Sequence, residues 1–181
     1  MANRAYLMNH FRSTATTAEA SEEACLLGAN YQLPILWVAL FEAADLSFVS
    51  VPCTNDDGEE FIGNIPTLFA PTAKVMESYA KRRASLAAAL GTENAGHIAE
   101  WEEFLSSHLP APMVQLDLGE LWMMYENHPD FELDVRDYLS GVNDPTAREW
   151  GILCSQAKLD DPEVRRYGVR GFPWHSAIQW A

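Results

Sequence analysis

The stretch from Leu33 to Phe41 constrains the fold of this 181-residue chain more than any other segment. It reads Leu-Pro-Ile-Leu-Trp-Val-Ala-Leu-Phe, and a run this apolar has to lie in a hydrophobic core. It is about half as long as a segment that spans a bilayer, so we do not interpret it as a transmembrane helix. Its period does not separate a buried strand from a short buried helix that begins at Pro34, and we favour the helix.

Alternating apolar residues predict short strands. Residues 3–9 and 46–51 have the pattern of strands. In the last nine residues, four large apolar side chains share one parity and therefore one face of a predicted C-terminal strand: Phe172, Trp174, Ile178 and Trp180. Such a face needs a core or a partner to cover it.

Two apolar stripes predict helices in the middle of the chain. The first has apolar residues at spacings of four and seven between Pro71 and Gly91, which suit the start and the end of a helix. The second runs from Ile98 to Leu109 and stops at Pro110. Their apolar faces consist of Val75, Tyr79, Leu86 and Leu90 in the first helix, and of Ile98, Trp101, Leu105 and Leu109 in the second.

Acidic residues mark the start of three further helices. Asp117 and Glu120 have the spacing of a capping box, in which each side chain accepts a hydrogen bond from the other residue's backbone amide. Asp144 and Asp161 each precede a proline, a residue that suits the first helical position.

These elements predict an α+β fold: a predominantly helical single domain with a small, mainly antiparallel sheet that includes the N-terminal and C-terminal strands. No repeat, low-complexity tract or linker divides residues 1–181, so we expect one domain. The 6 Trp, 8 Phe and 6 Tyr residues provide ample material for a core and exclude a disordered chain.

The sequence contains no motif for a catalytic or cofactor site. The histidines form no HxH or HExxH pair of the kind that binds zinc. Ser106-Ser107-His108 is not a catalytic dyad, because adjacent side chains on a helix diverge. Glycines at 58 and 63, and at 91 and 96, have the spacing of a phosphate-binding loop but lack the Lys-Ser/Thr that should follow. We therefore expect no catalytic residue, no metal and no cofactor.

The acidic loop Asn55-Asp56-Asp57-Gly58-Glu59-Glu60 does not fit a calcium-binding loop. When Gly58 is aligned with the sixth position of that motif, Cys53 stands first and Asn64 twelfth, where carboxylate ligands are required. Two interpretations remain for this loop. It is either a solvated turn between two strands or a contact surface for a basic partner.

The net charge limits the classes of partner. The chain has 12 Lys and Arg against 26 Asp and Glu, a net charge of −14, which exceeds the roughly 2–8 charges that suit a small soluble domain. It excludes most nucleic-acid-binding functions, since an acidic chain does not bind phosphate backbones non-specifically. It is compatible with fast association with a basic protein surface. The basic run Lys81-Arg82-Arg83 is expected on the solvated outer face of a helix.

The candidate partner-binding residues come from three acidic clusters. Helix dipoles account for Asp130, Asp161 and Glu163 near predicted helix starts. The remaining clusters supply the candidates, which are Asp56, Asp57, Glu59, Glu60, Glu100, Glu103, Asp134 and Asp137.

Cysteine content and the N-terminal residues predict a cytoplasmic protein. Cys25, Cys53 and Cys154 are odd in number and widely spaced, so we expect buried, reduced side chains rather than disulfides. The opening residues contain no apolar run long enough for a signal peptide.

The opening Met-Ala-Asn-Arg-Ala-Tyr-Leu, the apolar segment 33–41 and the aromatic C-terminal stretch that follows Tyr167-Gly168 resemble a group of small acidic bacterial proteins. Proteins of this kind are similar to immunity proteins, the cytosolic antidotes to toxins delivered by type VI secretion and related competition systems. The resemblance implies a cognate toxin as partner. It also implies inhibition by occlusion of the toxin's active site or by blocking of its assembly, and it carries over no catalytic residue.

The absence of an export signal adds the expectation of a toxin that acts in the cytosol. We expect a nuclease, because a nuclease has a basic cleft for which an acidic protein can compete. We expect no enzyme activity and no direct contact with nucleic acid or membrane. Two alternatives stay open: a regulatory or scaffold protein with another basic partner, and a small enzyme of unfamiliar type. A deep polar pocket with perturbed titratable groups would favour the enzyme.

Overall fold

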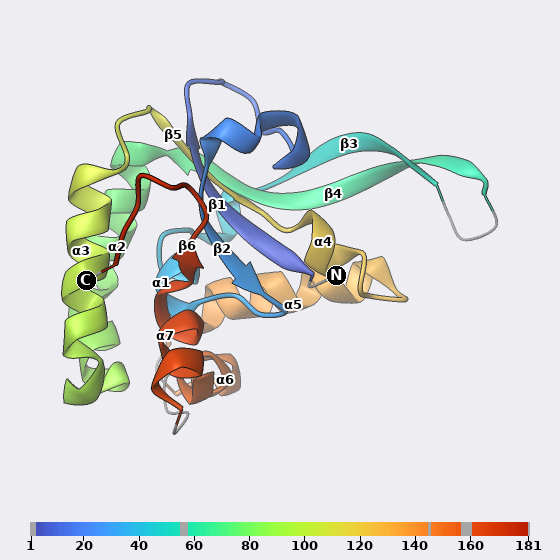
Figure 1. The fold of residues 1–181 in the computed structure, drawn as a ribbon. Helices are drawn as coiled ribbons and strands as arrows, with labels where there is room; N and C mark the ends of the chain where they lie inside the picture. Colours follow the sequence, from blue (N-terminus) through green and yellow to red (C-terminus); the bar gives the residue numbers. More distant parts are fainter. Residues whose placement is uncertain (1–2, 55–57, 145, 157–160, 181) are drawn as a thin grey trace.

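One antiparallel sheet organises the fold in the computed structural model, which describes residues 3–54, 58–144, 146–156 and 161–180 (Figure 1). Six strands of these residues lie in the order β3-β4-β5-β1-β2-β6. Their bounds are Arg4–His10 for β1, Cys25–Asn30 for β2, Leu46–Thr54 for β3, Glu60–Pro71 for β4, Met113–Asp117 for β5 and Phe172–Pro173 for β6. The expected α+β fold, with its N-terminal and C-terminal strands in the sheet, is confirmed.

The helices cover one side of this sheet and its ends (Figure 1). They are α1 (Ile35–Val38), α2 (Thr72–Leu90), α3 (Ala95–Ser107), α4 (Gly119–Trp122), α5 (His128–Gly141), α6 (Arg148–Gln156) and α7 (Pro162–Arg170). The described residues also form the short 3-10 helices η1 (Glu19–Ala24), η2 (Ala43–Asp45) and η3 (Thr92–Asn94). No helix in the described part of the chain is long and apolar enough to cross a membrane.

Residue alternation on the two central strands separates the faces of the sheet. Ala5 and Leu7 of β1 join Val114 and Leu116 of β5 in the main hydrophobic core beneath the helices. The opposite face carries Tyr6 and Met8, which pack with η1 and Trp174 in a second, smaller cluster. The same face carries Gln115 and Asp117, the cross-strand partners of Met8 and Tyr6. The thinly covered side of the sheet is therefore also its polar side.

The apolar segment 33–41 forms the short helix α1 and is buried throughout, as the favoured interpretation predicted. Trp37 anchors it by donating its indole N–H to the carbonyl of Arg170 at 3.0 Å. Gly171 lies directly against this indole with φ of +73°, and a Cβ there would collide with Trp37 and with the carbonyl of Gly28. The segment and the end of α7 are thereby fixed to each other.

The predicted helices in the middle of the chain are confirmed. α2 ends where Gly91 adopts a φ of 77°, in the left-handed region that glycine favours. The predicted apolar faces of α2 and α3 are buried, except for Leu109, which lies beyond the end of α3 and is half-buried.

Two local predictions are wrong because contacts between distant segments replace them. The C-terminal strand has only two residues, since the chain turns after Trp174 and brings Ile178 and Trp180 to the main core. The Asp117–Glu120 capping box does not form. Glu120 instead accepts hydrogen bonds from the backbone N–H of Arg4 and the hydroxyl of Tyr6, both at 3.0 Å.

Two predictions of solvent exposure or burial also need correction. Lys81 and Arg83 are exposed on α2 as expected, but Arg82 between them is 7% exposed because its side chain enters the interior. Cys25 and Cys154 are buried and none of the three cysteines forms a disulfide, whereas Cys53 is only half-buried because it lies on a hairpin that leaves the body of the protein. Trp150, Leu153 and Cys154 of α6 are buried.

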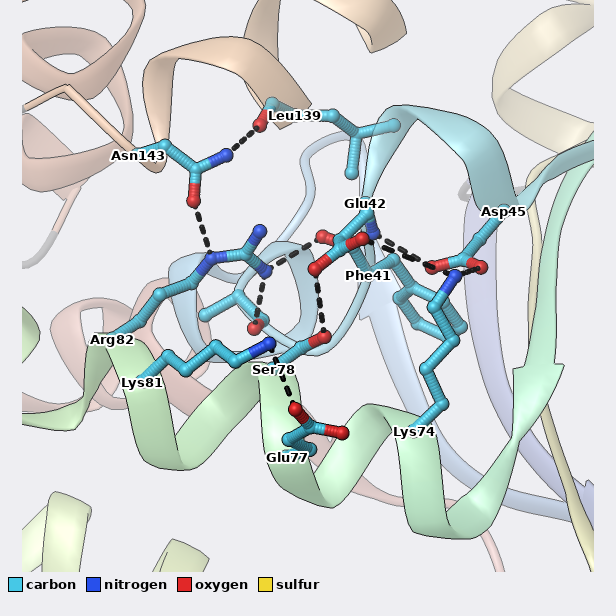
Figure 2. A network of polar contacts seen from close by, with 11 residues as sticks. Phe41, Glu42, Asp45, Lys74, Glu77, Ser78, Lys81, Arg82, Leu139 and Asn143 are labelled. Carbon is cyan, nitrogen blue, oxygen red and sulfur yellow. Dashed lines mark hydrogen bonds and ion pairs between the residues drawn. The ribbon is translucent and has the colours of Figure 1, made fainter.

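The Arg82 guanidinium joins three parts of the fold (Figure 2). It donates to the carbonyls of Ala39 and Phe41, at 2.8 and 2.7 Å, where the apolar segment ends. It also donates to the side-chain oxygen of Asn143 after α5, at 2.8 Å. Burial lowers the pKa of Arg82, and the carboxylates of Glu42 and Asp45 oppose this effect. The cation thus satisfies two buried backbone carbonyls that would otherwise lack a partner.

We expect Arg82→Met to lower the free energy of unfolding by about 3 kcal/mol, because it leaves the carbonyls of Ala39 and Phe41 unsatisfied in the interior. Urea denaturation followed by circular dichroism measures the change. Lys81→Met is the control, since Lys81 is exposed and pairs only with Glu77 one turn away. We expect less than about 1 kcal/mol from it. Equal losses in the two variants would contradict the role given to Arg82.

Candidate functional site

The predicted acidic residues lie on three separate elements. Glu59 and Glu60 are exposed at the far end of the β3–β4 hairpin. Asp56 and Asp57 lie outside the described residues. Glu100 and Glu103 are on α3 and Asp134 and Asp137 are on α5, and Figure 1 shows both helices away from the end of the hairpin. The structure therefore does not gather these residues into one surface.

Glu59, Glu100 and Asp134 each interact with other groups of the chain. Glu100 is 2.8 Å from the Nη2 atom of Arg170, a side chain that is 1% exposed and lies under the ring of Trp180. Asp134 accepts a hydrogen bond of 2.9 Å from the Tyr125 hydroxyl. Glu103 and Asp137 are exposed on their helices. Glu59 and Glu60 are thus exposed at the end of the hairpin that projects from the rest of the protein (Figure 1).

The β3–β4 hairpin forms an arm, which we define as residues 46–54 and 60–66, that extends away from the rest of the molecule (Figure 1). β4 pairs with β5 only from Thr67 onward, so the arm continues beyond the end of its neighbour. Strand β3 is an edge strand, since no strand of the described residues pairs with its outer side. Pro52 removes a hydrogen-bond donor from β3, a common feature of edge strands.

The arm exposes large apolar side chains. Ile62 is 65% exposed and Phe48 is 44% exposed, and the register places both on the same face of the hairpin. Phe61 is also exposed, on the other face. Glu60 lies on the face of Ile62, opposite Thr54. Apolar area beside carboxylates on a projecting element is a surface suited to protein contact.

A cavity of about 530 Å³ lies at the base of the arm, on the polar side of the sheet. Its walls come from β1, η1, both strands of the arm, α4 and the side chain of Trp174. Carboxylates line it at Glu19 and Glu22 of η1, at Glu120 of α4 and at Asp117 at the end of β5. We call it the Asp117 cavity.

Asp117 is 6% exposed and is held by two backbone amides. Its Oδ1 atom accepts from the N–H of Gly119 at 2.8 Å, and its Oδ2 atom accepts from the N–H of Ala18. Burial raises the pKa of Asp117, the two hydrogen bonds oppose the rise, and the nearby Glu120 carboxylate adds to it. A carboxyl group so placed exchanges its proton at a higher pH than a solvated aspartate.

The polar side chains of β5 also hold the segment that covers the cavity. The side-chain oxygen of Gln115 accepts from the backbone N–H of Thr16 at 3.1 Å, and its amide donates to the carbonyl of the same residue. The ring of His10 contacts the same Gln115 oxygen at 3.2 Å. Gln115 and Asp117 together fix residues 16–18 over the sheet.

Two other reactive side chains at the cavity, Cys25 and Tyr6, are poorly suited to covalent catalysis. Burial raises the pKa of the Cys25 thiol to about 12, so the thiolate is scarce at neutral pH. Burial likewise raises the pKa of Tyr6, whose hydroxyl already donates to Glu120. Among the described residues, no group of three or more His, Cys, Asp or Glu side chains is arranged to hold a metal ion.

Comparison with known proteins gives no relative: no protein-family model, curated protein or solved structure matches the chain.

The sequence interpretation missed the Asp117 cavity because it assigned Asp117 and Glu120 to each other. The sequence did indicate that Asp117 ends a strand, since apolar and polar side chains alternate between Val114 and Asp117 as they do in a strand with one buried face. The partners of these residues, Ala18 and Tyr6, are about a hundred residues away and have no local signature.

We expect Asp117→Asn to change the pH dependence of stability. Since burial raises the pKa of Asp117 in the folded state, the unfolded state releases its proton first as the pH rises, and the native chain loses stability. The difference in unfolding free energy, native minus Asp117→Asn, should therefore fall as the pH rises above the ordinary aspartate pKa of about 4. Urea denaturation across this range measures it. Asp137→Asn, at an exposed position, is the control. Parallel pH profiles for the native chain and Asp117→Asn would contradict the prediction.

Proposed function

We propose that this chain is an immunity protein, which binds a basic toxin and neutralises it by occluding the toxin's active site. The observation that carries the proposal is the arm, which exposes Phe61 and Ile62 close to Glu59 and Glu60, and Phe48 nearer its base. An acidic chain with a net charge of −14 is attracted to a basic surface, and exposed apolar side chains can then anchor the contact.

The shape of the arm suits occlusion. From Pro66 to Glu60 the hairpin runs past the end of β5 by about 20 Å at the usual rise per strand residue. Gly63, Ile65 and Pro66 are buried, so its free end is formed by Glu60, Phe61 and Ile62. A projecting end can enter a cleft that a flat surface would only cover. A nuclease has such a cleft lined with basic residues, and the acidic end of the arm would occupy the place of the phosphate backbone. We therefore favour a nuclease as the toxin, acting in the cytoplasm.

The direct test uses the product of the gene next to the one that encodes this chain. We expect the two proteins to purify as a complex, and we expect co-expression to protect bacteria from the toxicity of that product. Failure to form a complex together with failure to protect would overturn the proposal. A complex that forms without protection would favour the alternative of a regulatory or scaffold protein.

A small enzyme is the second candidate, and the raised pKa of Asp117 at a cavity favours it. Stoichiometry separates the two functions. An antidote that binds its toxin should abolish activity at one molar equivalent, whereas an enzyme that modifies the toxin or its product should act at far lower ratios.

We expect Ile62→Asp to weaken the complex by at least about tenfold, because it removes an apolar anchor from the exposed face of the arm. Glu60→Lys should weaken it by a similar factor, through loss of charge complementarity. Glu103→Lys on α3 is the matched control, since it makes the same change in net charge at an exposed site away from the arm. Calorimetric titration gives the three dissociation constants. If Glu60→Lys and Glu103→Lys weaken binding equally and Ile62→Asp does not, the arm is not the contact.

We expect the association rate constant to fall by about tenfold or more between low salt and ~0.5 M NaCl, because salt screens the attraction between oppositely charged surfaces. Stopped-flow fluorescence with purified partners measures this rate. A rate that does not depend on salt would mean that the charge serves solubility alone.

A further inference from the structure

The Asp117 cavity has a negative lining that the arm-mediated contact does not use. Its lining includes four carboxylates and no Lys, Arg or His side chain. Two of the four, Glu19 and Glu22, are exposed on η1, while Asp117 is buried. A site of this kind attracts a positive charge and disfavours an anion.

Asp117 in particular lacks a cationic partner. The groups that act on its carboxyl are two backbone amides and the like-charged Glu120. A carboxylate offers about four lone-pair positions, and the hydrogen bonds from Ala18 and Gly119 occupy one on each oxygen. A buried carboxylate is normally paired, so Asp117 has unused capacity for a charged donor.

The remaining lining explains which cation fits. Ile65, Met123 and Val51 contribute apolar wall, and Trp174 and Tyr6 contribute aromatic rings that meet edge to face at 5.0 Å. A metal ion would leave these apolar walls unused, whereas an organic cation on a hydrocarbon stem would contact them. Volumes of about 300–1,000 Å³ are usual for small-ligand sites, and this cavity falls within that range.

We propose that the Asp117 cavity binds an alkylguanidinium or alkylammonium group, with Asp117 as counter-ion and the apolar wall around the stem. Arg4 borders the cavity, since its guanidinium lies 5.2 Å from the centre of the Trp174 ring and its side chain interacts with Tyr6. It is not among the groups that act on the Asp117 carboxyl, so it does not serve as the counter-ion of Asp117. The same chemistry occurs in a free small molecule and in the Arg or Lys side chain of a protein.

The test compares n-butylguanidinium with n-butylurea, which has the same shape and no charge. Both are titrated into the full chain alone, and the backbone amide signals of Ala18 and Gly119 are followed by NMR, since these amides donate to Asp117. We expect saturable shifts of both signals with n-butylguanidinium and at least about tenfold weaker binding of n-butylurea. Equal binding of the two compounds, or no shift with either, would overturn the proposal.

A variant pair tests the role of the carboxylate. Asp117→Asn should weaken n-butylguanidinium binding at least about tenfold, whereas Glu103→Gln, with the same loss of charge on α3, should leave it unchanged. Equal effects would overturn the assignment of Asp117 as counter-ion. If Asp117→Asn does not fold, the comparison of the two ligands on the native chain still decides the proposal.

Blocked arginine, N-acetylarginine methylamide, distinguishes the two sources of the cation. Binding as tight as that of n-butylguanidinium supports a protein side chain as occupant, and binding of n-butylguanidinium alone supports a free small molecule. No toxin is present in these titrations. A negative result in them would therefore not contradict the proposal that the arm binds a toxin, and a negative result in the toxin experiments would not contradict the proposal that the cavity binds a cation.

Discussion

The contact between Arg82 and the end of the apolar segment holds the architecture together. Segment 33–41 is too apolar to reach the surface, yet its last carbonyls need hydrogen-bond partners inside the protein. A guanidinium from α2 supplies the donors and also reaches Asn143 after α5. One buried cation thereby sets the relative positions of α1, α2 and α5 beneath the sheet, in a chain whose overall charge is strongly negative.

Different interactions stabilise the helix-covered face and the open face of the sheet. Beneath the helices, packing of apolar side chains stabilises the structure. On the other face, Gln115 and Asp117 bind the backbone of residues 16–18, so hydrogen bonds to side chains replace a second layer of helices. This cover is thin and leaves room beside it for the cavity. The arm borders the cavity through residues 51–54, which places the two candidate contact regions next to each other.

Local patterns predicted the parts of the fold that local physics determines. The stripes and end signals of α2 and α3 and the burial of segment 33–41 required only periodicity and the properties of proline and glycine. Arg82 was grouped with its exposed neighbours Lys81 and Arg83, although its spacing from Tyr79 and Leu86 places it on the face that α2 buries. Its partners, the carbonyls of Ala39 and Phe41, have no local signature in the sequence. Glu120 was misassigned for a similar reason, since its partner Tyr6 is 114 residues away.

Gly171 and Trp37 have a consequence for how relatives of this chain could be recognised. The indole occupies the space of a side chain at position 171, and the positive φ there disfavours any other residue. A side chain at position 171 would therefore collide with Trp37 as long as the indole keeps its place. A tryptophan within a short apolar segment, together with a glycine some 130 residues later, should therefore persist in homologues whose overall sequence identity has been lost.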